Sequence, residues 1–209
     1  MAVIDFSLYM VTDRDLLGGR NLIEEVKKAI KGGVTAVQLR EKKAGAREFY
    51  QMALALKQEM SGTGVPLIIN DRLDIALASG ADGLHIGQED LPLQTAAAIM
   101  PAGSIIGLSV NSELEAREGA RHGASYLGVG PVFQTTTKED ARSPIGLEGL
   151  RNIKEKNNIP LVAIGGINED NVTTVKNAGA EGVAVVSALM GAPDIETAAR
   201  RLIRLWRES

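Results

Sequence analysis

The chain contains no cysteine, and phenylalanine, tryptophan and tyrosine together make up only 3% of its 209 residues. Without cysteine it can form no disulfide, no thiolate metal site and no cysteine nucleophile. With so few aromatic side chains, we expect a core filled mainly by aliphatic residues. The 23 glycines indicate many tight turns in a globular protein.

Runs of lysine or arginine are also missing, and the formal net charge is −3. Nucleic-acid backbones are bound by clustered cations, so we expect no nucleic-acid partner. The longest apolar run, residues 183–190, is far too short to span a bilayer, so we expect no membrane partner. The first residues carry Asp5 within an apolar stretch and have no basic region, unlike a signal peptide. We therefore expect a cytoplasmic protein.

Strand-like and helical segments alternate along the whole chain. The predicted strands are residues 7–12, 35–39, 66–69, 83–86, 105–108, 126–132, 161–164 and 183–186. The predicted helices are residues 21–30, 44–60, 73–78, 92–100, 113–122, 147–156, 169–177 and 195–206. Eight apolar strands, each followed by a helix, predict a (β/α)₈ TIM barrel of the α/β class.

No linker or low-complexity segment interrupts this pattern, so residues 1–209 are predicted to form a single domain. An open, doubly wound sheet is the alternative, but the chain lacks the glycine fingerprint of a dinucleotide site. A weak repeat also favours the barrel. Similar segments, each a helix-ending glycine followed by a buried strand, begin at Gly33, Gly80, Gly123 and Gly179.

The carboxyl ends of the strands form the working face of such barrels, and polar residues follow several of them here. The candidates are Gln38, Arg40, Lys42, Asn70, Asp71, Asp90, Ser109, Thr135, Thr137, Lys138, Gly166 and Ser187. Arg40 can bind two phosphate oxygens at once and Lys42 adds a point charge, which suits a diphosphate. A surface ion pair with Glu41 explains the two cations equally well at this stage.

Asp71 and Asp90 follow adjacent strands, so their carboxylates are expected to converge. Together with substrate phosphate oxygens they would suit a magnesium ion, Mg²⁺. Each aspartate could instead cap the helix that follows it. Capping explains either residue alone, whereas both of them beside two cations favour a metal site.

Two further groups could hold phosphate. Thr135 and Thr137 offer hydroxyl donors beside Lys138, although an ordinary loop has the same composition. Gly165 and Gly166 allow close approach to the backbone, and with Ser187 they occupy the usual phosphate corner of these barrels. No nucleophile with an adjacent base is evident, and both histidines are expected to be structural. The pattern favours a reaction in which a diphosphate leaves and the protein neutralises charge.

The joint pattern of these segments resembles the thiamine-phosphate synthase family over essentially the whole chain. The segments that carry it are QLREK (38–42), INDRLDIAL (69–77), GADGLHIGQEDLP (80–92), GVGPVFQTTTK (128–138), AIGGI (163–167) and GVAVVSA (182–188). The resemblance implies a Mg²⁺-dependent transferase of thiamine biosynthesis. Its reaction would join hydroxymethylpyrimidine diphosphate to hydroxyethylthiazole phosphate, giving thiamine phosphate and pyrophosphate.

The resemblance also implies a role for each site residue. Substrate-binding residues would be Gln38, Arg40, Lys42, Asn70, Ser109 and Lys138 for the pyrimidine diphosphate, Thr135 and Thr137 for the thiazole phosphate, and Gly166, Val186 and Ser187 at the phosphate corner. Asp71 and Asp90 would hold the metal. Arg40, Lys42 and Lys138 would stabilise the departing diphosphate, the bond to which is thought to break before the thiazole attacks. Residues 139–144 are predicted to form a lid over the reaction.

Three alternatives to a synthase were considered. A related thiazole tautomerase would need a histidine after the sixth strand, where this chain has Pro131. A binding regulator without catalysis is expected to lack a carboxylate or a cation of the site, and a sugar-phosphate barrel to show paired acid–base groups. The sequence leaves open whether the protein forms a homo-oligomer.

Overall fold

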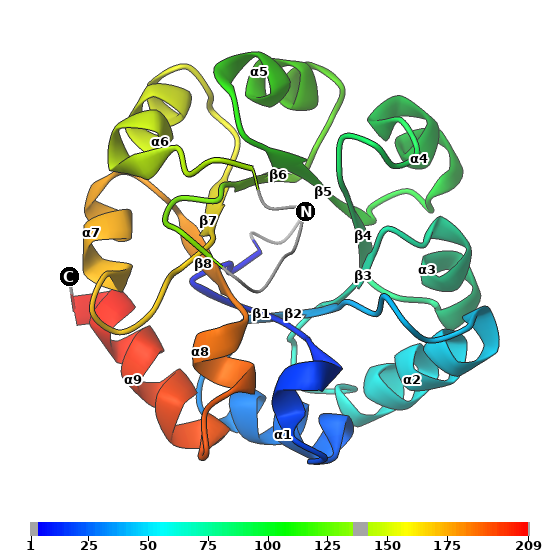
Figure 1. Ribbon diagram of the computed structural model, residues 1–209. Coiled ribbons are helices and arrows are strands. Elements are labelled where there is room, and N and C mark those ends of the chain that lie inside the picture. Colours follow the sequence, from blue (N-terminus) through cyan, green and yellow to red (C-terminus); the bar gives the residue numbers. More distant parts are fainter. Residues whose placement is uncertain (1–3, 136–141, 209) are drawn as a thin grey trace.

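Eight parallel strands close into a barrel, and the helices form a ring around it (Figure 1). The computed structural model describes residues 4–135 and 142–208. β8 (Gly182–Val185) pairs with both β7 (Leu161–Ile164) and β1 (Leu8–Val11), so the sheet has no free edge. The predicted (β/α)₈ barrel is confirmed.

The remaining elements alternate as the sequence predicts. The other strands are β2 (Ala36–Leu39), β3 (Leu67–Asn70), β4 (Gly83–Ile86), β5 (Ile105–Val110) and β6 (Tyr126–Val129). The helices are α1 (Leu22–Lys31), α2 (Ala46–Glu59), α3 (Leu73–Ser79), α4 (Leu93–Ile99), α5 (Glu113–Arg121), α6 (Gly146–Glu155), α7 (Val172–Asn177), α8 (Ser187–Met190) and α9 (Ile195–Glu208), with a 3₁₀ turn, η1 (Arg14–Leu17). In the described part of the chain, no helix is long and apolar enough to cross a membrane.

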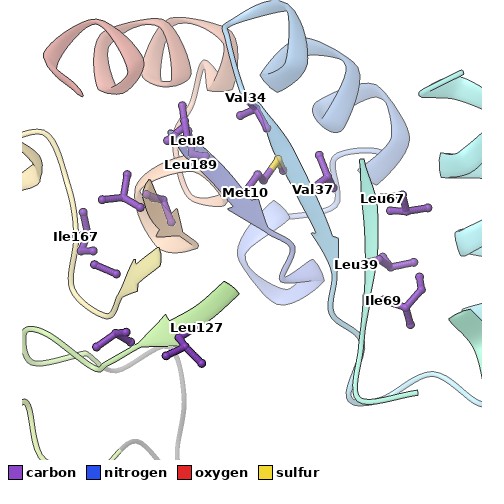
Figure 2. Packing of buried hydrophobic residues seen from close by; sticks show 14 of the residues in the cluster. Leu8, Met10, Val34, Val37, Leu39, Leu67, Ile69, Leu127, Ile167 and Leu189 are labelled. Carbon is purple, nitrogen blue, oxygen red and sulfur yellow. The ribbon is translucent and has the colours of Figure 1, made fainter. Parts of the chain in front are cut away.

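The core has two layers because successive strand residues point to opposite faces. The outer layer is aliphatic and lies between strands and helices; Figure 2 shows Leu8 and Met10 of β1 beside Val37 and Leu39 of β2. The inner layer fills the barrel and is a separate cluster that includes Phe6, Tyr9 and Tyr126. These three aromatic rings lie at the barrel centre, where the Phe6 and Tyr126 ring centroids are 4.5 Å apart.

The four glycines of the repeat lie between a helix and the strand that follows it, as predicted. Gly33, Gly80, Gly123 and Gly179 all have positive φ, at 110°, 63°, 86° and 98°. At Gly33 a β-carbon would also lie 2.9 Å from Ile203 Cγ2 of α9, so this joint needs glycine for its backbone and for its packing.

The boundaries of β6 and α7 differ most from the prediction. β6 ends at Val129 rather than at residue 132, because Pro131 has no N–H to extend the ladder. α7 begins at Val172 rather than at residue 169. The four-residue elements η1 and α8 were not predicted, since neither is long enough to show a helical period.

Candidate active site

A cavity of about 560 Å³ opens at the carboxyl ends of the strands. The predicted site residues that line it are Gln38, Arg40, Lys42, Asn70, Asp71, Asp90, Ser109, Thr135, Gly166, Val186 and Ser187. Thr137 and Lys138 lie outside the described residues, as does part of the predicted lid at 139–144. The fold therefore brings together every predicted site residue in the described part of the chain, while the role of each stays a prediction.

The two predicted diphosphate-binding cations follow β2. Arg40 Nη1 lies 3.5 Å from Asp13 Oδ2, and the Arg40 backbone N–H donates to Thr12 Oγ1 at 3.0 Å. Lys42 Nζ lies 2.5 Å from Asp71 Oδ2, across the gap to the end of β3. Both cations therefore have a protein carboxylate as their partner at the rim of the cavity.

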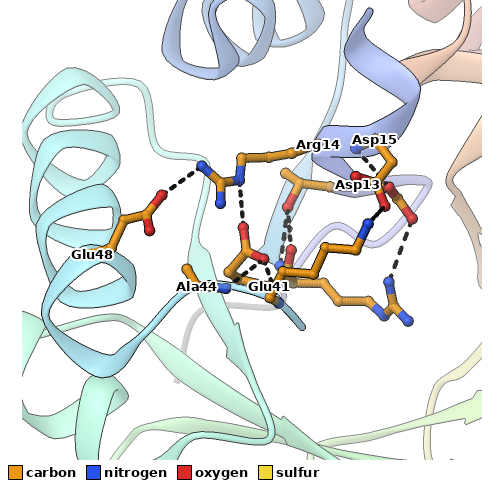
Figure 3. Close-up of polar contacts among 9 residues, drawn as sticks. Asp13, Arg14, Asp15, Glu41, Ala44 and Glu48 are labelled. Atoms are coloured by element: carbon orange, nitrogen blue, oxygen red, sulfur yellow. Dashed lines mark hydrogen bonds and ion pairs between the residues drawn. The ribbon is translucent and has the colours of Figure 1, made fainter. Parts of the chain in front are cut away.

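Glu41 turns away from the two cations on either side of it. Figure 3 shows Arg14 between Glu41 and Glu48, with Arg14 Nε 2.5 Å from Glu41 Oε2. Burial would raise the pKa of the Glu41 carboxyl, but N–H donors from Lys43 and Ala44 and the Arg14 guanidinium outweigh it and lower that pKa. The expected alternative, an ion pair between Glu41 and the flanking cations, is wrong among the described residues.

Asp71 and Asp90 lie next to each other at the ends of β3 and β4, and neither caps a helix. The N-cap of α3 is Arg72 and that of α4 is Pro92, without a side-chain hydrogen bond at either cap. Asp90 Oδ2 instead accepts from the Gly87 N–H at 2.7 Å. Burial raises the pKa of the Asp90 carboxyl, and the neighbouring Asp71 carboxylate raises it further.

This pair of carboxylates fits a divalent cation, because a positive ion between them would offset the effect of the Asp71 carboxylate on Asp90. Asp71 also has φ +62°, in the left-handed region that non-glycine residues rarely adopt and that is frequent at functional sites. Among the described residues, no group of three or more histidines, aspartates and glutamates could hold a metal. The rest of an Mg²⁺ shell would come from ligand oxygens and water, which is how Mg²⁺ is usually bound.

The predicted phosphate corner lies at the ends of β7 and β8. Gly165 and Gly166 have φ of 101° and 65°. A β-carbon at Gly166 would lie 2.6 Å from the backbone oxygen of Gln134, so only glycine fits there. Val186 precedes the short helix α8, and Ser187 is its first residue. The chain thus presents backbone groups and one hydroxyl to this end of the cavity.

His85 was expected to be structural, yet it lines the cavity together with Ser109. His85 Nε2 lies 2.8 Å from Ser109 Oγ, and His85 Nδ1 lies 2.8 Å from the hydroxyl of Tyr126. The expectation that no nucleophile lies beside a base is therefore wrong as geometry. The predicted site residues lie at or after the ends of the strands, whereas His85 lies inside β4, at the inward position between the outward Leu84 and Ile86.

Fold and site together define an enzyme of the TIM-barrel class, with two cations, two carboxylates and a glycine corner around one cavity at the carboxyl ends of the strands.

Comparison with known proteins gives the family. A model of the family described as thiamine monophosphate synthase matches residues 8–189. The thiamine-phosphate synthase of Syntrophomonas wolfei is 60% identical over 98% of both chains, and that of Desulfitobacterium hafniense is 49% identical over 98% of this chain and 99% of the relative. A solved thiamine phosphate pyrophosphorylase from Pyrococcus furiosus is 45% identical, with a TM-score of 0.91 over 98% of this chain and 97% of that one.

The chain belongs to the thiamine-phosphate synthase family. It is a transferase of thiamine biosynthesis that joins the pyrimidine diphosphate to the thiazole phosphate. A solved 3-hexulose-6-phosphate synthase, at 19% identity and a TM-score of 0.68 over 95% of this chain and 99% of that one, shares the fold alone.

Proposed function

We propose that the two sides of the cavity hold the phosphorylated ends of the two substrates. The diphosphate of the pyrimidine lies at Arg40 and Lys42, and the phosphate of the thiazole lies at Gly166 and Ser187. The observation that carries this proposal is that one cavity is lined by both groups. Arg40 and Lys42 follow β2, whereas Gly166 and Ser187 follow β7 and β8, and β1 lies between the two groups in the closed strand order.

The other residues of the cavity complete this assignment. Gln38, Asn70 and Ser109 contact the pyrimidine diphosphate, Thr135 and Thr137 contact the thiazole phosphate, and Val186 belongs to the corner with Ser187. Gln38 and Asn70 are buried polar residues at the cavity wall, where a bound ligand would provide further hydrogen-bond partners.

Asp71 and Asp90 hold Mg²⁺ in this proposal. Support comes from Asp90, since burial and the neighbouring Asp71 carboxylate both raise the pKa of its carboxyl group. When bound, the ion supplies Lewis-acid stabilisation of negative charge on phosphate oxygens. Lys42 is the ion-pair partner of Asp71, so a cation that takes its place at Asp71 frees Lys42 to bind diphosphate.

The chemistry assigned to the chain is charge neutralisation and positioning. The carbon–oxygen bond to the diphosphate breaks first, and the ring amino group stabilises the resulting pyrimidine-methyl cation. Arg40 and Lys42, with Lys138 from outside the described residues, neutralise the charge that gathers on the departing diphosphate. The thiazole nitrogen is already a neutral nucleophile and attacks the cation, so no protein base is needed.

Pyrophosphate release by the purified protein tests the metal requirement. With both phosphorylated substrates and Mg²⁺ present, release accompanies formation of thiamine phosphate, and a chelator stops both. Release that continues undiminished in chelator, with metal content verified, would overturn the metal assignment.

A crossed pair of variants tests the two ends of the cavity. Arg40→Lys keeps the charge but loses the bidentate geometry, so KM for the pyrimidine diphosphate rises roughly tenfold or more while KM for the thiazole phosphate changes little. In Ser187→Ala, KM for the thiazole phosphate rises and KM for the pyrimidine diphosphate changes little. The rise is smaller than in Arg40→Lys, because a single neutral hydrogen bond is lost. The same KM changing in both variants would contradict the assignment of separate ends.

A cytoplasmic location and a homo-oligomer both stay predictions. Cell fractionation tests the first, and sedimentation of the purified protein tests the second.

A further inference from the structure

Five polar side chains form a continuous hydrogen-bonded chain across the inside of the barrel. Gln38 Nε2 donates to the Tyr9 hydroxyl at 3.0 Å, and the Tyr9 and Tyr126 hydroxyls lie 2.8 Å apart. Tyr126 is 2.8 Å from His85 Nδ1, and His85 Nε2 is 2.8 Å from Ser109 Oγ. The chain thus joins strands β2, β1, β6, β4 and β5, and all five residues line the cavity.

The proton order along this chain follows from counting donors. The Tyr9 hydroxyl oxygen accepts from Gln38, so its own hydrogen needs an acceptor, and the Tyr126 oxygen is the one in the chain. Tyr126 must then donate to His85 Nδ1, which leaves the hydrogen of the ring on Nε2, facing Ser109. In the opposite order, with the Gln38 amide nitrogen still donating to Tyr9, the hydrogen of Tyr9 would have no acceptor in the chain, although Tyr9 is only 1% exposed.

Both phenols are held in the neutral form that this order requires. Burial raises the pKa of Tyr9, and burial raises the pKa of Tyr126 well above its ordinary value, with the neighbouring Tyr9 raising it further. Each hydroxyl therefore keeps its hydrogen and can act as donor and acceptor at once.

The barrel also keeps space for this chain. A β-carbon at Gly107 of β5 would lie 2.4 Å from the Tyr126 hydroxyl oxygen and 2.5 Å from His85 Nδ1. One at Gly128 of β6 would lie 2.9 Å from His85 Cε1. Since neither glycine has a positive φ, their lack of a side chain serves packing against this pair of rings.

We infer that Tyr9, Tyr126 and His85 are positioning residues that hold Ser109 as a hydrogen-bond donor and Gln38 as an acceptor toward the pyrimidine ring. His85 donates to Ser109 Oγ, so Ser109 keeps its own hydrogen and presents it to the cavity. Gln38 uses its amide nitrogen on Tyr9, so its carbonyl oxygen accepts from the ligand. An aminopyrimidine offers the matching groups, an amino donor and a ring-nitrogen acceptor.

The same order prevents the His85 and Ser109 pair from working as a base and a nucleophile. A general base must accept the serine proton at the nitrogen nearest to it, and here that nitrogen already carries hydrogen. His85 and Ser109 thus have the geometry of a catalytic pair. The hydrogen on His85 Nε2, however, lets His85 donate to Ser109 and not accept its proton. This inference rests on the proposed binding of the pyrimidine at Gln38 and Ser109.

Nitrogen-15 NMR of the histidine rings tests the proton order directly, without any ligand. The chain has two histidines, and His122→Gln leaves His85 as the single signal. We expect the tautomer with hydrogen on Nε2. The tautomer with hydrogen on Nδ1 would overturn the inference, because it would make His85 the base of Ser109.

Steady-state kinetics test whether the hydrogen-bonded chain strengthens binding of the pyrimidine diphosphate. Tyr126→Phe keeps the ring and breaks the chain, so KM for the pyrimidine diphosphate rises about tenfold, while KM for the thiazole phosphate and kcat stay within about twofold. Tyr50→Phe, which removes a hydroxyl on α2, is the matched control and changes neither constant. An unchanged KM in folded Tyr126→Phe would overturn the inference.

Two more pairs of variants separate this inference from the proposed function. His85→Gln keeps a donor toward Ser109 and raises KM for the pyrimidine diphosphate less than His85→Leu does; equal increases would overturn the positioning role. If Gln38→Ala and Ser109→Ala leave that KM unchanged, the proposed pyrimidine site itself is wrong. If they raise it and Tyr126→Phe does not, only the chain is wrong.

Discussion

Lys42 Nζ lies 2.5 Å from Asp71 Oδ2, so a predicted diphosphate-binding cation and a predicted metal-binding carboxylate are paired with each other. The side chain of Lys42 is 53% exposed and that of Asp71 is 22% exposed, so this ion pair is open to solvent. Breaking such an ion pair costs little free energy. The pair can therefore separate when a metal ion and a diphosphate arrive.

Substitutions at the two partners are expected to change Mg²⁺ binding in opposite directions. Lys42→Met removes the competing ammonium group, so the substrate-free protein binds Mg²⁺ roughly two- to fivefold more tightly, the effect of one exposed ion pair. Asp71→Asn removes a ligand charge and weakens binding. Calorimetric titration with Mg²⁺ measures both. Weaker binding by Lys42→Met would show that Lys42 does not compete with the ion.

The backbone conformation of Asp71 predicts that glycine at this position gives a more stable protein than alanine does. With φ at +62°, an alanine there adopts a conformation that costs L residues roughly 1–2 kcal/mol, whereas glycine adopts it freely. Both changes remove the carboxylate, so Asp71→Gly should exceed Asp71→Ala in free energy of unfolding by about 1 kcal/mol. Urea denaturation provides the comparison.

The exposed helical residue Gln51 of α2 supplies the control for that pair. There the order should reverse, with Gln51→Ala more stable than Gln51→Gly by about 1 kcal/mol. The same order at both positions would mean that the left-handed backbone of Asp71 is not what sets it.

Glu41 predicts a pH-dependent contribution to stability. Because its pKa is lower in the folded protein than in the unfolded chain, its contribution is fully present above its ordinary pKa and is lost as pH falls through the lowered value. The free energy of unfolding of Glu41→Gln should therefore be lower by roughly 2 kcal/mol at neutral pH, the size expected for hydrogen bonds to a charged group. The difference from the parent protein should shrink steadily on acidification.

Chemical denaturation from pH 7 down to the acid range measures this effect. Glu48→Gln is the matched control, since Glu48 is the other partner of Arg14 but its side chain is 54% exposed. That substitution should cost less than about 1 kcal/mol at any pH. A loss for Glu41→Gln that does not change with pH would assign its role to packing rather than to charge.

The sequence predicts the barrel and much of its cavity because both depend on local patterns. Apolar strands alternate with amphipathic helices, and polar residues such as Arg40 and Asp90 follow strand ends, which meet at one face in any closed parallel barrel. Side-chain contacts between different strands could not be predicted in the same way. The pairing of Lys42 with Asp71, or of His85 with Ser109, depends on register and rotamers, which no single segment encodes.

The inward-facing residues were missed for a related reason. Strands of a parallel barrel are buried on both faces, so they read as continuous apolar runs and the period-two signal is weak. Tyr9 and Tyr126 are consistent with an ordinary core in such runs, although they lie on the inner face. His85 in β4 and Gln38 in β2 break that pattern. A polar residue between Leu84 and Ile86, or between Val37 and Leu39, marks the inner face of its strand.

Gly107→Ala tests how closely the inside of the barrel is packed. The added methyl group would lie 2.2 Å from Tyr126 Cζ and 2.5 Å from His85 Nδ1, so both rings or the backbone must move. Overpacking of this kind costs roughly 1–3 kcal/mol, which urea denaturation will detect. Gly45→Ala, where nothing lies within 4 Å of the new methyl group, should stay within about 1 kcal/mol of the parent.

A double-mutant cycle locates the cause of that cost. In a Tyr126→Leu background one of the two rings that the new methyl group meets is gone, so Gly107→Ala should cost at least about 1 kcal/mol less than it does alone. Additive effects of the two changes would place the strain elsewhere in the barrel. A coupled result, together with a changed nitrogen-15 signal of His85 in Gly107→Ala, would mean that this glycine is needed for the geometry of the Tyr126–His85 contact itself.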